Sequence, residues 1–320
     1  MKGLRIMSLA LISSMTFTAC GGQVSRDSGD AQRSTGESNP ILVAAALYPL
    51  AEIVESVGGK HVNVINLTPP GTDAHGVELS AQQLESLNEA KITFYLGQNY
   101  QPTVQRSIQS LKSRTVDLLD SLELQTTSDS GHSDHEHAES DGAGETKDPH
   151  VWLDPAYMID MARVVANNLS QIRPEYANEF AKNASSYIDT LEVLGKEIDT
   201  RFSNCTSRTL VTAHFSFGYF ARRANLEVYS VAEINPDEQL SAKKLEELAT
   251  VVKAKKVTTI FYEELVSTDL ARTLADKAGV TTNTINPLEG MSQKDLDAGK
   301  TYLSVQRDNI KKIAQSLSCS

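Results

Sequence analysis

Three histidines and one glutamate stand in loops where their side chains could bind a metal ion: His75, His150, His214 and Glu289. Zinc takes four ligands in a tetrahedron and favours imidazole nitrogen and carboxylate oxygen. Three neutral imidazoles and one carboxylate would fill this shell and neutralise half of the charge of the ion. A single histidine is more often structural than a ligand, so the prediction of a zinc site depends on all four residues together.

Other residues could supply the fourth ligand, and such a site could be catalytic instead of serving only to bind the metal. Glu263 and Glu264 end a predicted strand and are the next candidates for the fourth ligand. A catalytic zinc usually has three protein ligands and an open position for water, so Glu289 as a base would make the site a hydrolase. The sequence has no His-Glu-x-x-His motif and offers a fourth protein ligand, which favours binding without catalysis.

Four further residues near these positions receive other roles. Trp152 is expected to pack beneath the site, and Asp148 is expected to orient an imidazole. Glu78, three residues after His75, is expected to face solvent or to support a ligand, and His61 to lie on the surface.

Alternating strand-like and helix-like segments must position these residues. In the first half, residues 41–47, 62–67, 92–96 and 115–119 are strand-like, and residues 50–57, 80–90 and 103–112 are helical. This order predicts a parallel sheet with helices on both faces. Ligands of such sheets bind beyond the carboxyl ends of the strands, which is where His75 lies.

The second half repeats the pattern after two helices, 156–171 and 174–202. The second helix, about 42 Å long at 1.5 Å per residue, would suit a bridge between two lobes. Strands are predicted at 209–212, 228–231, 258–262 and 280–285, and helices at 242–253, 268–277 and 294–317. His214 and Glu289 follow two of these strands, so the four candidates could converge only between the lobes.

The N-terminus is typical of an exported protein. Lys2 and Arg5 precede an uncharged, largely apolar run, 6–19, which is too short to span a bilayer and fits a secretion signal. Cys20 follows at a place that resembles the lipobox of bacterial lipoproteins. We therefore expect a signal peptide 1–19, a lipidated flexible tether 20–39, an N-terminal lobe 40–172, a linking helix 173–203 and a C-terminal lobe 204–320.

Residues 125–147 interrupt the first lobe with a polar, acidic segment that contains His132, His135 and His137. Such a composition predicts a disordered loop. The segment is either a plain acidic linker or an accessory arm that collects metal weakly, because flexible histidines lose conformational entropy when they chelate.

Net charge argues against one class of partner, and the cysteine count leaves two possible states for Cys205 and Cys319. The net charge of −11 and the lack of a long basic run argue against nucleic acid. If Cys20 carries lipid, Cys205 and Cys319 remain as a pair that is either bridged in an oxidising compartment or present as two free thiols.

Four motifs together resemble those of the cluster A-I solute-binding proteins of metal ABC transporters, and most closely the zinc-specific branch. The resemblance covers nearly the whole mature chain, and its motifs are residues 69–75, 148–155, 212–220 and 286–290.

The resemblance implies an α/β fold of two (β/α)4 lobes with parallel sheets, joined by one long backbone helix, with the metal buried between the lobes. It assigns His75, His150, His214 and Glu289 as ligands. Manganese-binding relatives typically have a carboxylate in place of His214 and Asp as the fourth ligand, so His214 favours zinc.

The function that this implies is high-affinity capture of Zn²⁺ outside the cytoplasm and its delivery to the permease subunits of an ABC importer. The expected protein is a monomer, not an enzyme, and is held at the membrane by its lipid anchor. A manganese- or iron-binding member of the family, or a surface adhesin with the same fold, is the alternative.

Overall fold

The computed structural model describes residues 39–111, 113–126, 147–232, 234–236, 241–265 and 268–320. The predicted signal peptide, Cys20 and the three histidines His132, His135 and His137 lie outside the described residues. The predictions on them, and the boundaries of the predicted lobes, stay predictions.

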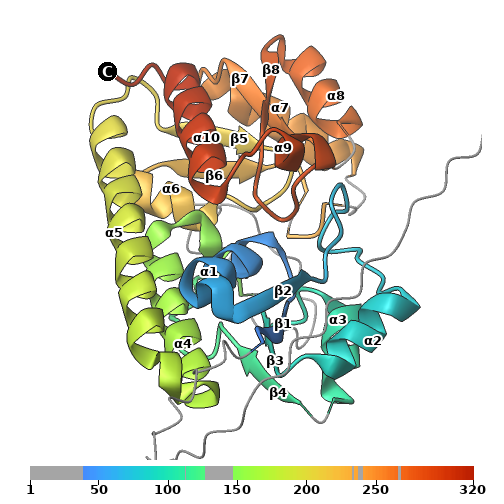
Figure 1. Ribbon diagram of the computed structural model, residues 1–320. Coiled ribbons are helices and arrows are strands. Elements are labelled where there is room, and N and C mark those ends of the chain that lie inside the picture. Colours follow the sequence, from blue (N-terminus) through green and yellow to red (C-terminus); the bar gives the residue numbers. More distant parts are fainter. Residues whose placement is uncertain (1–38, 112, 127–146, 233, 237–240, 266–267) are drawn as a thin grey trace, which may run out of the picture. The chain divides into compact units, whose positions relative to one another are not determined.

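Two parallel four-stranded sheets carry the described chain, as the alternating pattern predicts (Figure 1). The order is β2-β1-β3-β4 in the first sheet and β6-β5-β7-β8 in the second, so the two halves have the same topology. The strands are β1 (Ile41–Ala45), β2 (Val62–Asn66), β3 (Ile92–Tyr95), β4 (Arg114–Asp117), β5 (Thr209–Thr212), β6 (Glu227–Ser230), β7 (Thr259–Glu263) and β8 (Thr281–Ile285). The strand order reverses between β1 and β3 and between β5 and β7, and ligands of open α/β sheets bind beside such points.

Helices connect and cover the strands. They are α1 (Tyr48–Gly58), α2 (Ala81–Glu89), α3 (Pro102–Gln109), α4 (Pro155–Ile172), α5 (Ala177–Arg201), α6 (Gly218–Ala224), α7 (Ala242–Ala254), α8 (Asp269–Ala278), α9 (Gln293–Asp297) and α10 (Tyr302–Ser316). Local sequence sets their ends: Ser80 and Gln83 form the capping box of α2. Gly59 ends α1 at a φ of +53°, a conformation that glycine adopts without strain.

The long helix α5 contacts both halves of the structure (Figure 1). It packs against α1 and α4 of the first half and against α6 and α10 of the second. It is three residues shorter at its start than the sequence predicts, because Pro174–Tyr176 form a 3-10 turn before it. Within the described part of the chain, no helix has both the length and the apolar character that a membrane span needs.

The prediction of one continuous helix over residues 294–317 is wrong, because this segment forms two helices. α9 ends at Asp297, and Gly299 then adopts a φ of +70°. Thr301 starts α10 with a second capping box, in which Ser304 is the partner. The chain therefore turns between the two helices.

Cys205 and Cys319 are joined by a disulfide. They are 114 residues apart in the sequence, and their backbones pair as an isolated antiparallel bridge. The bridge fastens the C-terminus to the segment that follows α5.

Candidate metal centre

The four predicted ligands come together at the ends of their elements. His75 lies in the loop after β2, and His150 immediately precedes a 3-10 turn formed by Val151–Leu153. His214 follows β5 by two residues, and Glu289 follows β8 by four. One donor atom from each of the four side chains lies within 4.8 Å of the other three.

The arrangement identifies which nitrogen of each histidine faces the centre. Oε1 of Glu289 lies 3.5 Å from Nε2 of His75 and 3.0 Å from Nε2 of both His150 and His214. His150, His214 and Glu289 are buried, and the side chain of His75 is 8% exposed. Three imidazole nitrogens around one carboxylate oxygen, shielded from water, are a donor set that suits zinc.

Buried carboxylates also lie at the second ring nitrogen of two histidines. Oδ1 of Asp148 lies 2.7 Å from Nδ1 of His150 and accepts a hydrogen bond of 2.9 Å from the backbone N–H of the same residue. Oε2 of Glu263 lies 2.7 Å from Nδ1 of His214. The position of Asp148 agrees with its expected role of orienting an imidazole.

Aromatic rings pack against His75 and His150, the two histidines of the site that come from the first half of the chain. The ring of His75 meets the edge of Tyr100 with centroids 4.7 Å apart. Trp152 is buried with its ring centroid 5.3 Å from that of His150, and its Nε1–H donates to the carbonyl oxygen of Pro287 at 2.7 Å. Trp152 therefore packs beside the site as predicted, and it also ties His150 to the loop of Glu289.

The charges of the site are strongly coupled. Burial lowers the pKa of His214, but the nearby carboxylates of Glu263 and Glu289 outweigh it and raise the pKa well above its usual value. Burial likewise opposes protonation of His150, while Asp148 and then Glu289 raise its pKa overall. For Glu289, burial favours the neutral acid, yet the surrounding histidines bring its pKa well below the usual range.

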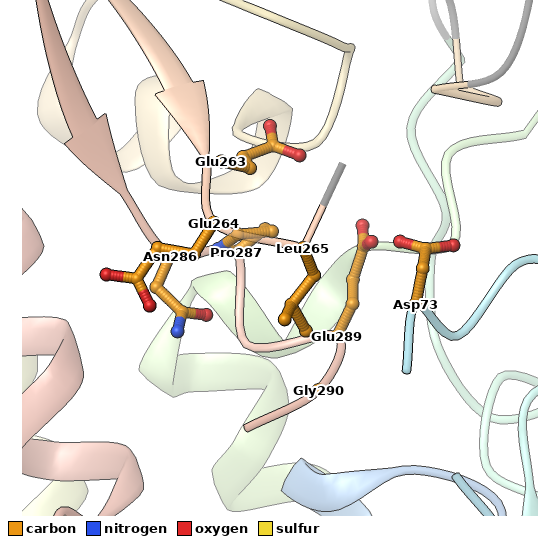
Figure 2. Close-up of a pocket in the computed structure, with 8 residues that line it drawn as sticks. All are labelled: Asp73, Glu263, Glu264, Leu265, Asn286, Pro287, Glu289 and Gly290. Carbon is orange, nitrogen blue, oxygen red and sulfur yellow. The ribbon is translucent and has the colours of Figure 1, made fainter. Parts of the chain in front are cut away.

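Asp73 is a member of the site that the sequence reasoning did not single out. Its Oδ1 accepts the backbone N–H of His75 at 2.9 Å, and its carboxylate points toward that of Glu289 (Figure 2). Burial and the charge of Glu289 raise the pKa of Asp73 to about 6. The signal was present, because Asp73 precedes His75 by two residues as Asp148 precedes His150.

The remaining candidates lie elsewhere. Glu264 and Glu78 are exposed, and neither belongs to the group of four converging donors. Glu263 is buried at the far side of His214 and also lies outside that group. The prediction that His61 is a surface residue is wrong: its ring stacks on Tyr176 with centroids 3.7 Å apart and is buried.

Comparison with known proteins gives a consistent match along the chain. The family model described as "ZnuA: Zinc-uptake complex component A periplasmic" matches residues 43–316. The zinc-binding lipoprotein AdcA of Streptococcus pneumoniae is 32% identical over 311 residues, covering 96% of this chain and 60% of AdcA. The chain thus spans only 60% of the length of that relative.

Solved structures show the same fold. The Zn(II)-bound ZnuA-like domain of Streptococcus pneumoniae AdcA matches with a TM-score of 0.71 at 30% identity, covering 87% of this chain and 99% of that domain. The laminin-binding protein Lmb of Streptococcus agalactiae, described as having adhesin and metal transporting activity, matches with a TM-score of 0.75 at 24% identity. Its alignment covers 87% of this chain and 99% of Lmb, and it shows a likeness of fold alone.

Proposed function

Since the chain belongs to the family of periplasmic A components of zinc-uptake complexes, we propose that it captures zinc outside the cytoplasm and delivers it to the permease of an ABC importer. The observation that carries this proposal is the convergence of three Nε2 atoms and one carboxylate at a buried point. We assign His75, His150, His214 and Glu289 as the zinc ligands.

The state of the donor atoms supports a cation at this point. Within the described residues, Nε2 of His75, Nε2 of His150 and Oε2 of Glu289 are buried without a hydrogen-bond partner. Buried polar atoms that lack a partner are costly, and coordination to a divalent ion would satisfy them. The imidazole-rich set favours zinc over manganese, which prefers carboxylate and other oxygen ligands.

Transport without catalysis is the role that four protein donors support. A catalytic zinc ion usually keeps one position open for water, whereas four side chains would close the tetrahedron here. We propose that Cys20 carries a lipid, which would hold the protein at the outer face of the membrane beside its permease. The name of the AdcA relative, a lipoprotein, supports this placement.

Metal analysis of the protein tests the metal and the stoichiometry. The chain purified without added metal should contain one zinc ion per molecule and no comparable amount of manganese or iron. In competition titrations against a chromophoric chelator, zinc should bind far more tightly than manganese. Preferential binding of manganese would assign the protein to the alternative branch of the family, and a protein that binds neither ion would contradict the proposal.

The transport role needs a cellular test. A strain that lacks the gene should grow poorly in zinc-depleted medium and recover with the wild-type gene. A gene that encodes His214→Ala should restore growth only when zinc is added. Full recovery with this variant would contradict a role for the site in zinc uptake.

A further inference from the structure

Glu263 is a buried carboxylate that the proposed ligand set does not use. It is the last residue of β7, and its exposed fraction is 1%. β5 and β7 are parallel neighbours with Thr212 opposite Phe261, so His214 and Glu263 each lie two residues beyond this pair. The register therefore places the two side chains together, at the point where the strand order of the second sheet reverses.

The contact with His214 explains why the carboxylate of Glu263 can be buried. Oε2 of Glu263 lies 2.7 Å from Nδ1 of His214. In the part of the chain that the structure describes, neither oxygen of Glu263 nor Nδ1 of His214 has an aligned hydrogen bond, so this close approach is the polar contact that each of them makes. An ionised carboxylate is costly to bury unless it is paired, and the imidazole of His214 is the partner that the fold supplies.

The geometry separates this role from that of a ligand. Nδ1 and Nε2 lie on different edges of an imidazole, and Nε2 of His214 is the nitrogen that faces Glu289, at 3.0 Å. Figure 2 shows the carboxylate of Glu263 apart from the facing carboxylates of Glu289 and Asp73. Glu263 therefore contacts the side of His214 that faces away from the other donors.

We propose that Glu263 is a positioning residue, which holds the proton of His214 on Nδ1 and so keeps Nε2 free to bind zinc. A neutral imidazole carries one N–H, and a carboxylate at one nitrogen fixes the tautomer, the ring orientation and the basicity of the other nitrogen. Asp148 stands in the same relation to His150. This inference rests on the proposed zinc site and adds to it a residue from β7, a strand that supplies none of the four proposed ligands.

Substitutions at Glu263 and His214, measured by chelator competition, test the role. Glu263→Ala should weaken zinc binding about 10–100-fold, the usual effect of removing such a partner. Glu263→Gln should weaken it less, because the amide oxygen can still accept the Nδ1–H. The combined variant Glu263→Ala/His214→Ala should bind zinc no more weakly than His214→Ala alone, because Glu263 acts through the ring that is missing.

The matched control is Glu227→Gln, at the opposite end of the same sheet, where the carboxylate is exposed and pairs with Lys255. It should bind zinc as the wild type does. Thermal unfolding of each metal-free variant shows whether it folds. If Glu263→Ala does not fold, Glu263→Gln and its combination with His214→Ala supply the same comparison.

The outcomes separate this inference from the proposed function. Wild-type affinity in His214→Ala would overturn the zinc site itself. Weak binding in His214→Ala together with wild-type affinity in the folded Glu263 variants would overturn only the positioning role. Losses that multiply in the combined variant would also overturn it, because Glu263 would then act on zinc independently of His214.

Discussion

His150 and His214 each use both of their ring nitrogens. Nε2 of each ring faces Glu289, and Nδ1 of each lies 2.7 Å from a second buried carboxylate. A buried ring that lies between carboxylates at both edges cannot rotate freely, so the direction of its lone pair is set before a metal arrives. At the scale of the residue, affinity should depend on these rings more than on any other pair of side chains.

Replacing one of these rings tests the assignment directly. His150→Ala should lower zinc affinity at least tenfold, about 1.4 kcal/mol, because one of four coordinate bonds is replaced by a weaker bond to water. Chelator competition measures this change. His61→Ala is a matched control, since His61 is also buried but its Nε2 pairs with Glu179 away from the site. Equal affinities in the two variants would contradict the ligand role of His150.

Zinc affinity should fall steeply as the pH is lowered. Carboxylates raise the pKa of His150 and of His214 in the metal-free protein, so these rings hold protons above pH 6.5, where a free histidine would lose them. Glu289, whose pKa is lowered, stays ionised throughout. Because zinc must displace the protons, the loss should begin above about pH 6.5 and approach tenfold per histidine per pH unit.

Competition titrations at several pH values measure the slope, which counts the protons released per zinc ion. More than one proton is expected near pH 5.5. A flat profile between about pH 7 and pH 5 would be typical of a shell made of carboxylates and would exclude a three-histidine site.

The convergence of the four proposed ligands could be predicted from the sequence, but the carboxylates that contact them could be predicted only in part. His214 and Glu289 lie two and four residues after predicted strands, and loops after parallel strands are where ligands gather. The contact between Glu263 and His214 depends on the register of β7 against β5, which no local pattern reveals. The sequence therefore offered Glu263 only as an alternative ligand, whereas the structure places it beside Nδ1 of His214 and outside the group of converging donors.

At the scale of elements, the 3-10 turn beside His150 is bonded to the second half of the structure. The hydroxyl of Tyr302 donates to the carbonyl oxygen of Trp152 at 2.6 Å, and Nε2 of Gln306 donates to that of Leu153 at 3.2 Å. Both donors come from α10. His150 precedes α4 in sequence, yet α10 and the loop of Pro287 hold the turn that positions it.

Tyr302→Phe should therefore lower stability and affect the site. The substitution removes the donor to a buried carbonyl oxygen, which should lower the free energy of unfolding by about 1–3 kcal/mol. Denaturant titration of the metal-free protein measures it, and chelator competition should show weaker zinc binding. Unchanged stability and affinity together would mean that α10 does not support the turn.

The boundary between α9 and α10 is a feature that the sequence pattern did not predict. The apolar pattern runs through residues 294–317 with little change, and only Gly299 and the pair Thr301 and Ser304 mark the break. A glycine within a helical pattern costs only about 1 kcal/mol, so it does not by itself end a helix. The long periodic segments were predicted well because burial along one face leaves a repeating pattern.

At the scale of the molecule, the four proposed ligands come from segments that lie outside residues 127–146. Thr126 and Lys147 pair as an isolated antiparallel bridge, so the ends of the intervening segment are adjacent. Deleting residues 128–146, with His132, His135 and His137, should leave one tight zinc site and remove only weaker binding events. Calorimetry would count the tight and weak binding events, and loss of the tight site would mean that one of these three histidines is a primary ligand.

The disulfide should support the stability of the whole unit without contributing to the metal site. It closes a loop of 114 residues between Cys205 and Cys319, which restricts the unfolded chain, and both residues lie outside the group of converging ligands. Replacing both cysteines with serine should lower the free energy of unfolding by about 2–5 kcal/mol. Urea titration should be made on metal-free protein, because zinc stabilises whichever folded form it binds.

Zinc affinity of the folded double variant should stay within about twofold of the wild type, since distant sites act independently. A single replacement, Cys205→Ser, should destabilise the protein as much as the double replacement, because either one opens the same loop. If the double variant lost zinc affinity while it remained folded, the disulfide would have to shape the site through β5, which begins four residues after Cys205 and leads to His214.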